Sequence, residues 1–244
     1  MQIPDTRIHP DGPLQELFTN SARSSRSVTR DIPRIHAVTD DQILAHPEFT
    51  SRARGVMRAL GPRGAVHLRA RYLTAAQIYA IALALGDAQE RTLCWLVVNE
   101  RLDIALAART RAAQLTSRSL EIADARLVAG EMPLGASIHS ASEAEAAERD
   151  GADWVVAGHV FSTGSHEGMP GRGVSLVSDV VRHTALPCIA IGGVRPEFVG
   201  TLRDAGAYGV AAISGIWGAP SAEAAATDYL SHYDGSGAAA RGLS

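Results

Sequence analysis

The sequence predicts a single-domain α/β protein in which eight strand–helix units close into a (β/α)8 barrel, the TIM barrel. Two observations support this prediction. The chain has 244 residues, of which 46% are hydrophobic, and this is the size of one such barrel with one large core. Short apolar runs alternate along the chain with helix-like segments, which is typical of buried parallel strands joined by helices.

Eight strands are expected where a short apolar run is bounded by small or polar residues. They lie at residues 34–38, 65–68, 92–98, 112–115, 134–138, 154–157, 188–191 and 210–213. In a parallel barrel, the loops that follow the strands all lie on one face and surround one mouth. We therefore expect the functional residues in these loops.

Helices are expected between the strands and after the last one. They lie at residues 48–60, 74–85, 102–108, 124–129, 141–149 and 221–233. Thr74 and Ser140 are expected N-caps, because their hydroxyl oxygens can accept hydrogen bonds from the free N–H groups of a first turn. Glu143 follows Ser140 by three residues, which predicts a capping box.

The predicted barrel occupies residues 34–233 and leaves a segment at each end. Residues 1–33 combine prolines, serines and arginines without an apolar period, so they cannot bury enough surface to offset the entropy of ordering. Residues 234–244 are rich in glycine, alanine and serine. We expect a flexible N-terminal extension and a flexible tail.

Composition excludes several classes of partner. The net charge of −3 provides no basic face for nucleic acid. Cys94 and Cys188 lie within apolar runs, so each is expected to behave as a small hydrophobe. No apolar segment approaches the ~20 residues that span a bilayer, and the N-terminus lacks a signal peptide's apolar core. A cytoplasmic protein without membrane or nucleic-acid partners is expected.

Two glycine-containing loops predict a phosphate site. Gly192 and Gly193 follow the seventh predicted strand, and Ser214 and Gly215 follow the eighth. In this fold these two loops lie side by side, and glycine lets backbone N–H groups approach an anion. The alternative is that the glycines only serve tight turns.

His159 follows the sixth predicted strand, so it is expected at the mouth. An imidazole with an ordinary pKa near ~6.5 can both accept and donate a proton at neutral pH. A purely structural histidine is the alternative. His67, His139 and His166 lie at other strand ends or in the mouth loop, and each could assist.

Eight motifs between Ile35 and Tyr229 resemble the TenI/thiamine phosphate synthase family of (β/α)8 barrels. They are HAVTD at 36–40, VHLRAR at 66–71, VVNERLDIALAA at 97–108, DAR at 124–126, LGASIHS at 134–140, GADWVVAGHVFSTGS at 151–165, AIGGV at 190–194 and GVAAISGIWG at 209–218. The resemblance implies a barrel that acts in thiamine biosynthesis.

The chain departs from the synthase pattern at several positions. Synthases of this family hold Mg²⁺ with two aspartates, because the leaving pyrophosphate needs a hard cation. Here the matching residues are Glu100 and Ser119, and the synthase's glutamine, lysine and proline are replaced by His67, Arg71 and His159. These departures predict that the protein uses no metal and no cofactor.

The motif GHVF at 158–161, the run at 168–173 and VSLVSDV at 174–180 are instead similar to TenI, the thiazole tautomerase. The resemblance to this branch implies an isomerase that aromatises a carboxythiazole phosphate tautomer, the product of thiazole synthase, by a metal-free proton shift. His159 would be its acid/base group. The expected substrate-binding residues are Arg69, Asn99, Ser137, Thr163, Gly192, Gly193, Ile213 and Ser214.

Two other functions are compatible with the same fold. One is a thiamine phosphate synthase, which joins a pyrimidine diphosphate to a thiazole phosphate, with a degraded metal site. The other is a non-catalytic, regulatory barrel that binds thiazole or thiamine phosphate. Barrels of this family often form homodimers, and nothing in the sequence identifies an interface.

Overall fold

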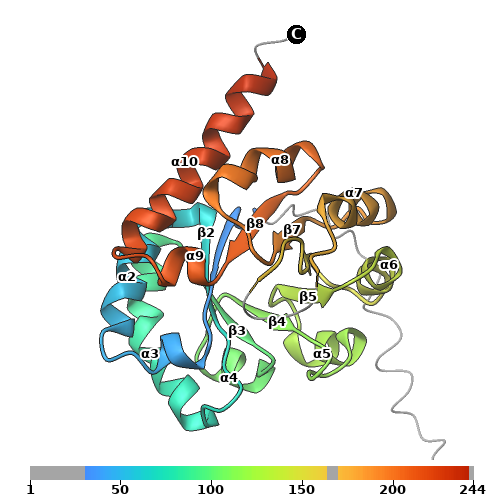
Figure 1. The fold of residues 1–244 in the computed structure, drawn as a ribbon. Coiled ribbons are helices and arrows are strands. Elements are labelled where there is room, and N and C mark those ends of the chain that lie inside the picture. Colours follow the sequence, from blue (N-terminus) through green and yellow to red (C-terminus); the bar gives the residue numbers. More distant parts are fainter. Residues whose placement is uncertain (1–30, 164–169, 242–244) are drawn as a thin grey trace, which may run out of the picture. The chain divides into compact units, whose positions relative to one another are not determined.

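The computed structural model describes residues 31–163 and 170–241, with side chains up to residue 235 (Figure 1). Residues 1–30 of the predicted extension, the candidate His166 and the last three residues of the predicted tail lie outside the described residues. Ile32 is buried inside the barrel. The packed part of the chain therefore begins two residues before the predicted boundary at residue 34.

Eight parallel strands close into one barrel in chain order, and strand β1 pairs with β8 through Ile35 and Val210. The (β/α)8 prediction is confirmed. The strands are β1 (Ile35–Val38), β2 (Gly64–Leu68), β3 (Trp95–Asn99), β4 (Ala112–Leu115), β5 (Leu134–Ile138), β6 (Trp154–Ala157), β7 (Cys188–Ile191) and β8 (Gly209–Ala212).

Helices surround the barrel, as Figure 1 shows. They are α1 (Asp41–Leu44), α2 (Phe49–Leu60), α3 (Ala75–Thr92), α4 (Leu102–Ala107), α5 (Ile122–Ala129), α6 (Ala141–Arg149), α7 (Val174–His183), α8 (Val199–Asp204), α9 (Ser214–Trp217) and α10 (Ala222–Arg241). No described helix is both long and apolar enough to cross a membrane.

The predicted helix caps are confirmed, with one correction. Thr74 and Gln77 form a complete capping box at α3. Ser140 caps α6 by accepting from the Glu143 N–H group. The Glu143 carboxylate accepts from the N–H of His139 (2.8 Å) rather than from that of Ser140, so the predicted capping box is not complete.

Two helices run further than predicted. α3 continues to Thr92, where Leu93 ends it in the left-handed conformation (φ 61°), so β3 starts at Trp95 rather than at residue 92. α10 continues to Arg241, eight residues beyond the predicted end at Tyr233. The flexibility of residues 234–244 stays a prediction.

The barrel interior is filled at the amino ends of the strands and open at their carboxyl ends. The rings of Trp95 and Trp154 pack edge to face inside the barrel, with their centroids 6.2 Å apart. Small and branched residues such as Ala65, Val97 and Ile189 pack in the same cluster. A second, larger core lies between the strands and the helices. This filling leaves the carboxyl face as the place for a site.

Both cysteines are buried and free. Burial raises the pKa of the Cys188 thiol to about 12 and that of Cys94 further still. Neither thiol ionises near neutral pH, so the prediction that they behave as small hydrophobes is confirmed.

Candidate active site

A cavity of about 910 Å³ opens at the carboxyl ends of the strands. All nine residues that the sequence predicts for the site line it, namely Arg69, Asn99, Ser137, His159, Thr163, Gly192, Gly193, Ile213 and Ser214. His67 and His139 line it as well. The strand ends converge as the fold requires, so the predicted residues share one cavity, and their individual roles stay predictions.

The β7 and β8 loops form one side of the cavity. Gly192 and Gly193 have positive φ angles of 102° and 63°. A Cβ atom on Gly192 would lie 2.4 Å from Cβ of His159, and one on Gly193 would lie 2.4 Å from the Ser162 carbonyl oxygen. Glycine is therefore required here for close packing of the β6 loop, whether or not the backbone also binds phosphate.

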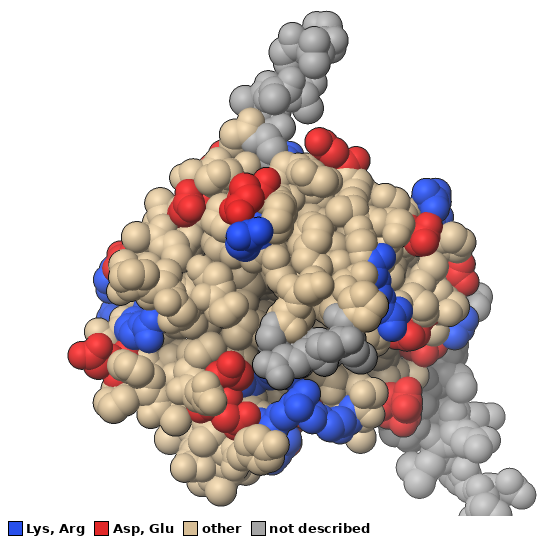
Figure 2. Space-filling view, in the orientation of Figure 1, with Lys and Arg blue, Asp and Glu red and all other residues tan. Residues whose placement is uncertain are grey.

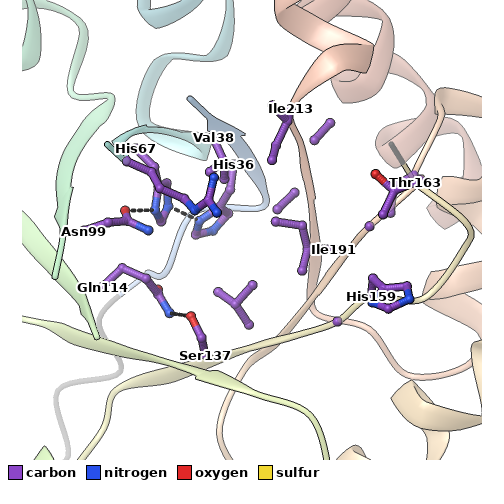
Figure 3. A pocket seen from close by; sticks show the side chains of 18 of the residues that line it. His36, Val38, His67, Asn99, Gln114, Ser137, His159, Thr163, Ile191 and Ile213 are labelled. Atoms are coloured by element: carbon purple, nitrogen blue, oxygen red, sulfur yellow. Dashed lines mark hydrogen bonds between the residues drawn. The ribbon is translucent and has the colours of Figure 1, made fainter. Parts of the chain in front are cut away.

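His159 lies on the same side as these loops, across the cavity from His67 and Asn99 (Figure 3). It is 8% exposed, and its Nε2 atom lies 3.2 Å from the Pro170 carbonyl oxygen. Because a carbonyl can only accept, Nε2 carries the proton in this contact. In neutral His159 the lone pair is then on Nδ1.

A chain of hydrogen bonds joins two buried histidines on the opposite side. His36 Nδ1 lies 2.8 Å from His67 Nε2, and His67 Nδ1 lies 3.1 Å from the atom placed as Asn99 Oδ1, as the dashed lines in Figure 3 mark. His36 Nε2 donates to the Pro33 carbonyl oxygen at 2.9 Å. Sequence reasoning missed His36, which precedes the carboxyl end of β1 by two residues.

Burial keeps both histidines neutral at neutral pH. It lowers the pKa of His36 to about 4, and burial together with the His36 charge holds the pKa of His67 well below its ordinary value. With Pro33 accepting from His36, each neutral ring has one N–H to donate, so the chain runs from Asn99 through His67 to His36. This order requires the Asn99 amide nitrogen, rather than its oxygen, to face His67.

Because burial lowers the pKa of His36, we expect the protein to lose stability in mild acid. The unfolded chain binds a proton at His36 near pH 6.5, whereas the folded protein binds it only near pH 4, so the free energy of unfolding falls as the pH drops through this range. His36 alone should contribute a loss of roughly 2 to 3 kcal/mol between pH 8 and pH 4.5. Urea unfolding at both pH values measures this loss.

Two variants test whether His36, rather than another titrating group, causes this loss of stability. His36→Asn should make the unfolding free energy less dependent on pH, whereas His183→Gln, at an exposed position on α7, should leave the dependence unchanged. An unchanged pH dependence in His36→Asn would show that His36 does not carry the effect.

The cavity floor contains a further polar pair. Gln114 Nε2 donates to Ser137 Oγ at 3.1 Å, where β4 and β5 run side by side. Gln114 is 2% exposed and lines the cavity, and sequence reasoning missed it because it stands within an otherwise apolar strand. Ile191, Val156 and Ile213 complete an apolar wall between this floor and the β7 and β8 loops.

The cavity is positively charged. Its lining contains the arginines Arg69, Arg71, Arg118 and Arg195, against the single carboxylate of Glu100, among the described residues. Figure 2 shows basic side chains gathered on this face in the lower half of the view. Burial and the neighbouring Arg71 lower the pKa of Arg69, which remains a cation. The cavity therefore suits anionic ligands.

The residues at the positions of the synthase aspartates do not fit a two-carboxylate Mg²⁺ site. Arg118 donates to both carboxylate oxygens of Glu100, through Nε at 3.2 Å and through Nη2. Ser119 offers only a hydroxyl, which accepts from the Thr116 N–H group at 3.0 Å. The described residues contain no group of three or more His, Cys, Asp or Glu side chains that could hold a metal. Independence from metal stays a prediction.

Comparison with known proteins leads to thiamine phosphate synthases. A family model described as thiamine monophosphate synthase matches residues 35–216. A thiamine-phosphate synthase of Methanoculleus marisnigri is 32% identical over 194 residues, 79% of this chain and 91% of the relative. A thiamine-phosphate synthase of Chlorobium luteolum is 36% identical over 186 residues, which are 75% of this chain and 88% of that relative. The solved thiamine phosphate pyrophosphorylase of Pyrococcus furiosus is 26% identical, with a TM-score of 0.74 over 83% of this chain and 96% of the other.

These matches overturn the prediction of a thiazole tautomerase. The two relatives are named as synthases and the solved structure as a pyrophosphorylase, and none of the three is named as an isomerase. The departures at His67, Arg71 and His159 therefore occur in a chain that is similar to synthases, and they do not identify the tautomerase branch. The predicted alternative, a synthase with an altered metal site, agrees better with these findings.

Proposed function

Because the chain belongs to the thiamine monophosphate synthase family and is thus an enzyme of thiamine biosynthesis, we propose that it is a thiamine phosphate synthase. As a transferase it would join a pyrimidine diphosphate to a phosphorylated thiazole. The lone pair of the thiazole nitrogen forms a C–N bond to the pyrimidine methylene carbon. The C–O bond to the diphosphate breaks, and pyrophosphate leaves with the electron pair.

The observation that supports this proposal is that arginines and glycine loops line different sides of one cavity, where each could hold an anionic group. Arg69, Arg71 and Arg118 line it at the ends of β2 and β4, and the glycine loops after β7 and β8 line it on the other side. A pocket of about 910 Å³ is large for one small phosphate ester and suits two small substrates together. Two anionic groups can thus be held apart while the rings meet between them.

The residues between these regions would position the two rings. Ile191, Val156 and Ile213 offer apolar surface, which excludes water from the carbon under attack. The neutral His67 and Asn99 are held in one orientation by their hydrogen bonds, so they can face a heteroaromatic ring without reorganising. Holding both reactants in line is the main contribution a protein makes to a displacement of this kind.

The proposal is tested by mixing the full chain with both substrates and measuring thiamine phosphate by chromatography. Product should form only when both substrates are present. Product formation without the pyrimidine diphosphate would contradict a transferase. Binding of both substrates without turnover would instead support the regulatory, non-catalytic barrel.

The variant His159→Asn tests the role predicted for His159. Bond formation at the thiazole nitrogen removes no proton from carbon, so no step of the transfer requires a general base. We expect His159→Asn to keep kcat within about tenfold of the wild type, since a typical acid/base residue contributes ~10²- to 10⁴-fold. A fall of 10² or more, with unchanged substrate affinity, would restore the acid/base role.

A further inference from the structure

The pair of Glu100 and Arg118 stands where the family's metal-binding carboxylates would be expected. Glu100 follows β3 and has a left-handed backbone (φ 67°), and Arg118 lies in the loop after β4. The Glu100 side chain is 15% exposed and that of Arg118 is 48% exposed. The guanidinium group thus covers the carboxylate and keeps a face toward the cavity that both residues line.

Two more guanidinium groups line the cavity next to this pair. Arg69 and Arg71 belong to the segment that follows β2, and the charges of Arg71 and Arg118 both act on Arg69. No hydrogen bond or ion pair joins either side chain to another residue in ranges 31–163 and 170–241, although the Arg71 backbone N–H donates to Asp41. The carboxylates of Glu100 and Asp40 also act on Arg69, and those of Glu100 and Asp41 act on Arg118.

The mutual repulsion of the three guanidinium groups raises the free energy of the folded protein to the extent that these carboxylates do not offset it, and an anionic ligand would lower it. A diphosphate carries several charged oxygens, and guanidinium groups bind such oxygens through paired N–H donors. A divalent cation would have to displace Arg118 from both oxygens of Glu100 and would find only a hydroxyl at Ser119. The donors present thus favour an anion over a metal.

We propose that Arg69, Arg71 and Arg118 form a diphosphate-binding site that works without a divalent cation, in which Arg118 supplies the positive charge that Mg²⁺ supplies in the family's synthases. This inference deepens the proposed function, on which the identity of the diphosphate as leaving group rests. The guanidinium groups donate N–H bonds to the diphosphate oxygens and stabilise the charge that develops as the C–O bond breaks.

Binding of inorganic pyrophosphate to the full chain in EDTA, measured by titration calorimetry, tests the site without requiring turnover. The wild type should bind pyrophosphate, and Arg118→Gln should weaken binding by about tenfold or more. Arg101→Gln is the matched control. Arg101 is also an arginine near the end of β3, but it pairs with Asp103 and does not line the cavity, so its loss should change binding by less than twofold.

The substitution of Arg118 also uncovers Glu100, which gives a second prediction. Mg²⁺ should not improve pyrophosphate binding to the wild type, whereas it should partly restore binding to Arg118→Gln. Arg118→Lys should retain more affinity than Arg118→Gln, because it keeps the charge. Pyrophosphate binding by the wild type that requires Mg²⁺, or equal affinities of the wild type and Arg118→Gln in EDTA, would overturn the proposal.

The two proposals can fail separately. If pyrophosphate binds in EDTA as expected but no thiamine phosphate forms, the arginine site stands and the transferase does not. If thiamine phosphate forms only after Mg²⁺ is added, the transferase stands and the metal-independent site does not.

Discussion

Replacing Arg69 with glutamine is expected to lower kcat/KM for thiamine phosphate formation by roughly 10²- to 10³-fold. Arg69 is half-buried and lines the cavity, so its charge acts where little water screens it. Negative charge builds up on the leaving diphosphate in the transition state, and a cation aimed there lowers the barrier more than it strengthens substrate binding. The loss should therefore fall mainly on kcat.

Steady-state kinetics in EDTA measure this effect, with Arg101→Gln as the control for the loss of one surface charge. The melting temperature of Arg69→Gln should stay close to that of the wild type, because Arg69 makes no side-chain hydrogen bond within the described residues. A kcat/KM within threefold of the wild type would show that Arg69 does not stabilise the leaving diphosphate.

The second large effect is on stability, at Gly192. Gly192→Ala should cost about 3 kcal/mol or more of the free energy of unfolding, because its φ of 102° disfavours any side chain. The added methyl group would also meet the His159 Cβ atom at 2.4 Å and its Cα atom at 2.7 Å. The backbone of the β6 loop would then have to move, which would also displace His159 from the cavity wall.

Gly130→Ala separates the two causes. Gly130 also has a positive φ (54°), but nothing lies within 4 Å of the added atom. Gly130 has ψ −118°, a backbone conformation that residues with a side chain rarely adopt. This variant should therefore lose stability through backbone strain alone, and should lose less than Gly192→Ala. Urea unfolding of both variants gives the comparison. Similar losses in the two would show that the close approach to His159 does not matter.

The barrel was predictable because its strands are short apolar runs and its loops carry glycine and polar residues. The same regularity placed Asn99, Ser137 and Ile213 in one cavity, since residues that follow parallel strands must meet at one face. Element ends were less predictable. Residues 86–92, which are mostly polar, continue α3 to Thr92, and the left-handed Leu93 ends it.

Sequence reasoning missed His36 and Gln114 because each lies inside an apolar strand. A single polar residue in such a run gives no sign that it faces a functional site. The signal was their inward position in the period-two pattern, which they share with His67 and Asn99. The hydrogen bond between His36 and His67 depends on the stagger of adjacent strands. The sequence alone does not reveal that stagger.

The error about function has a physical origin. The absence of two aspartates predicts a reaction without a metal and so favours a tautomerase, but a leaving diphosphate needs positive charge, which a metal or a group of arginines can supply. The ion pair between Glu100 and Arg118 joins residues 18 positions apart in two loops. No periodic pattern predicts such a contact.

In the proposed reaction one cavity holds both substrates, and the pyrimidine group passes from the diphosphate to the thiazole nitrogen. A single-turnover experiment with enzyme in excess and EDTA present tests it most directly, by quantifying thiamine phosphate and pyrophosphate from a limiting amount of pyrimidine diphosphate. Both products should appear together, one of each for every pyrimidine diphosphate consumed. Recovery of the pyrimidine diphosphate intact both in EDTA and after Mg²⁺ is added in excess, while thiazole phosphate is bound, would contradict it.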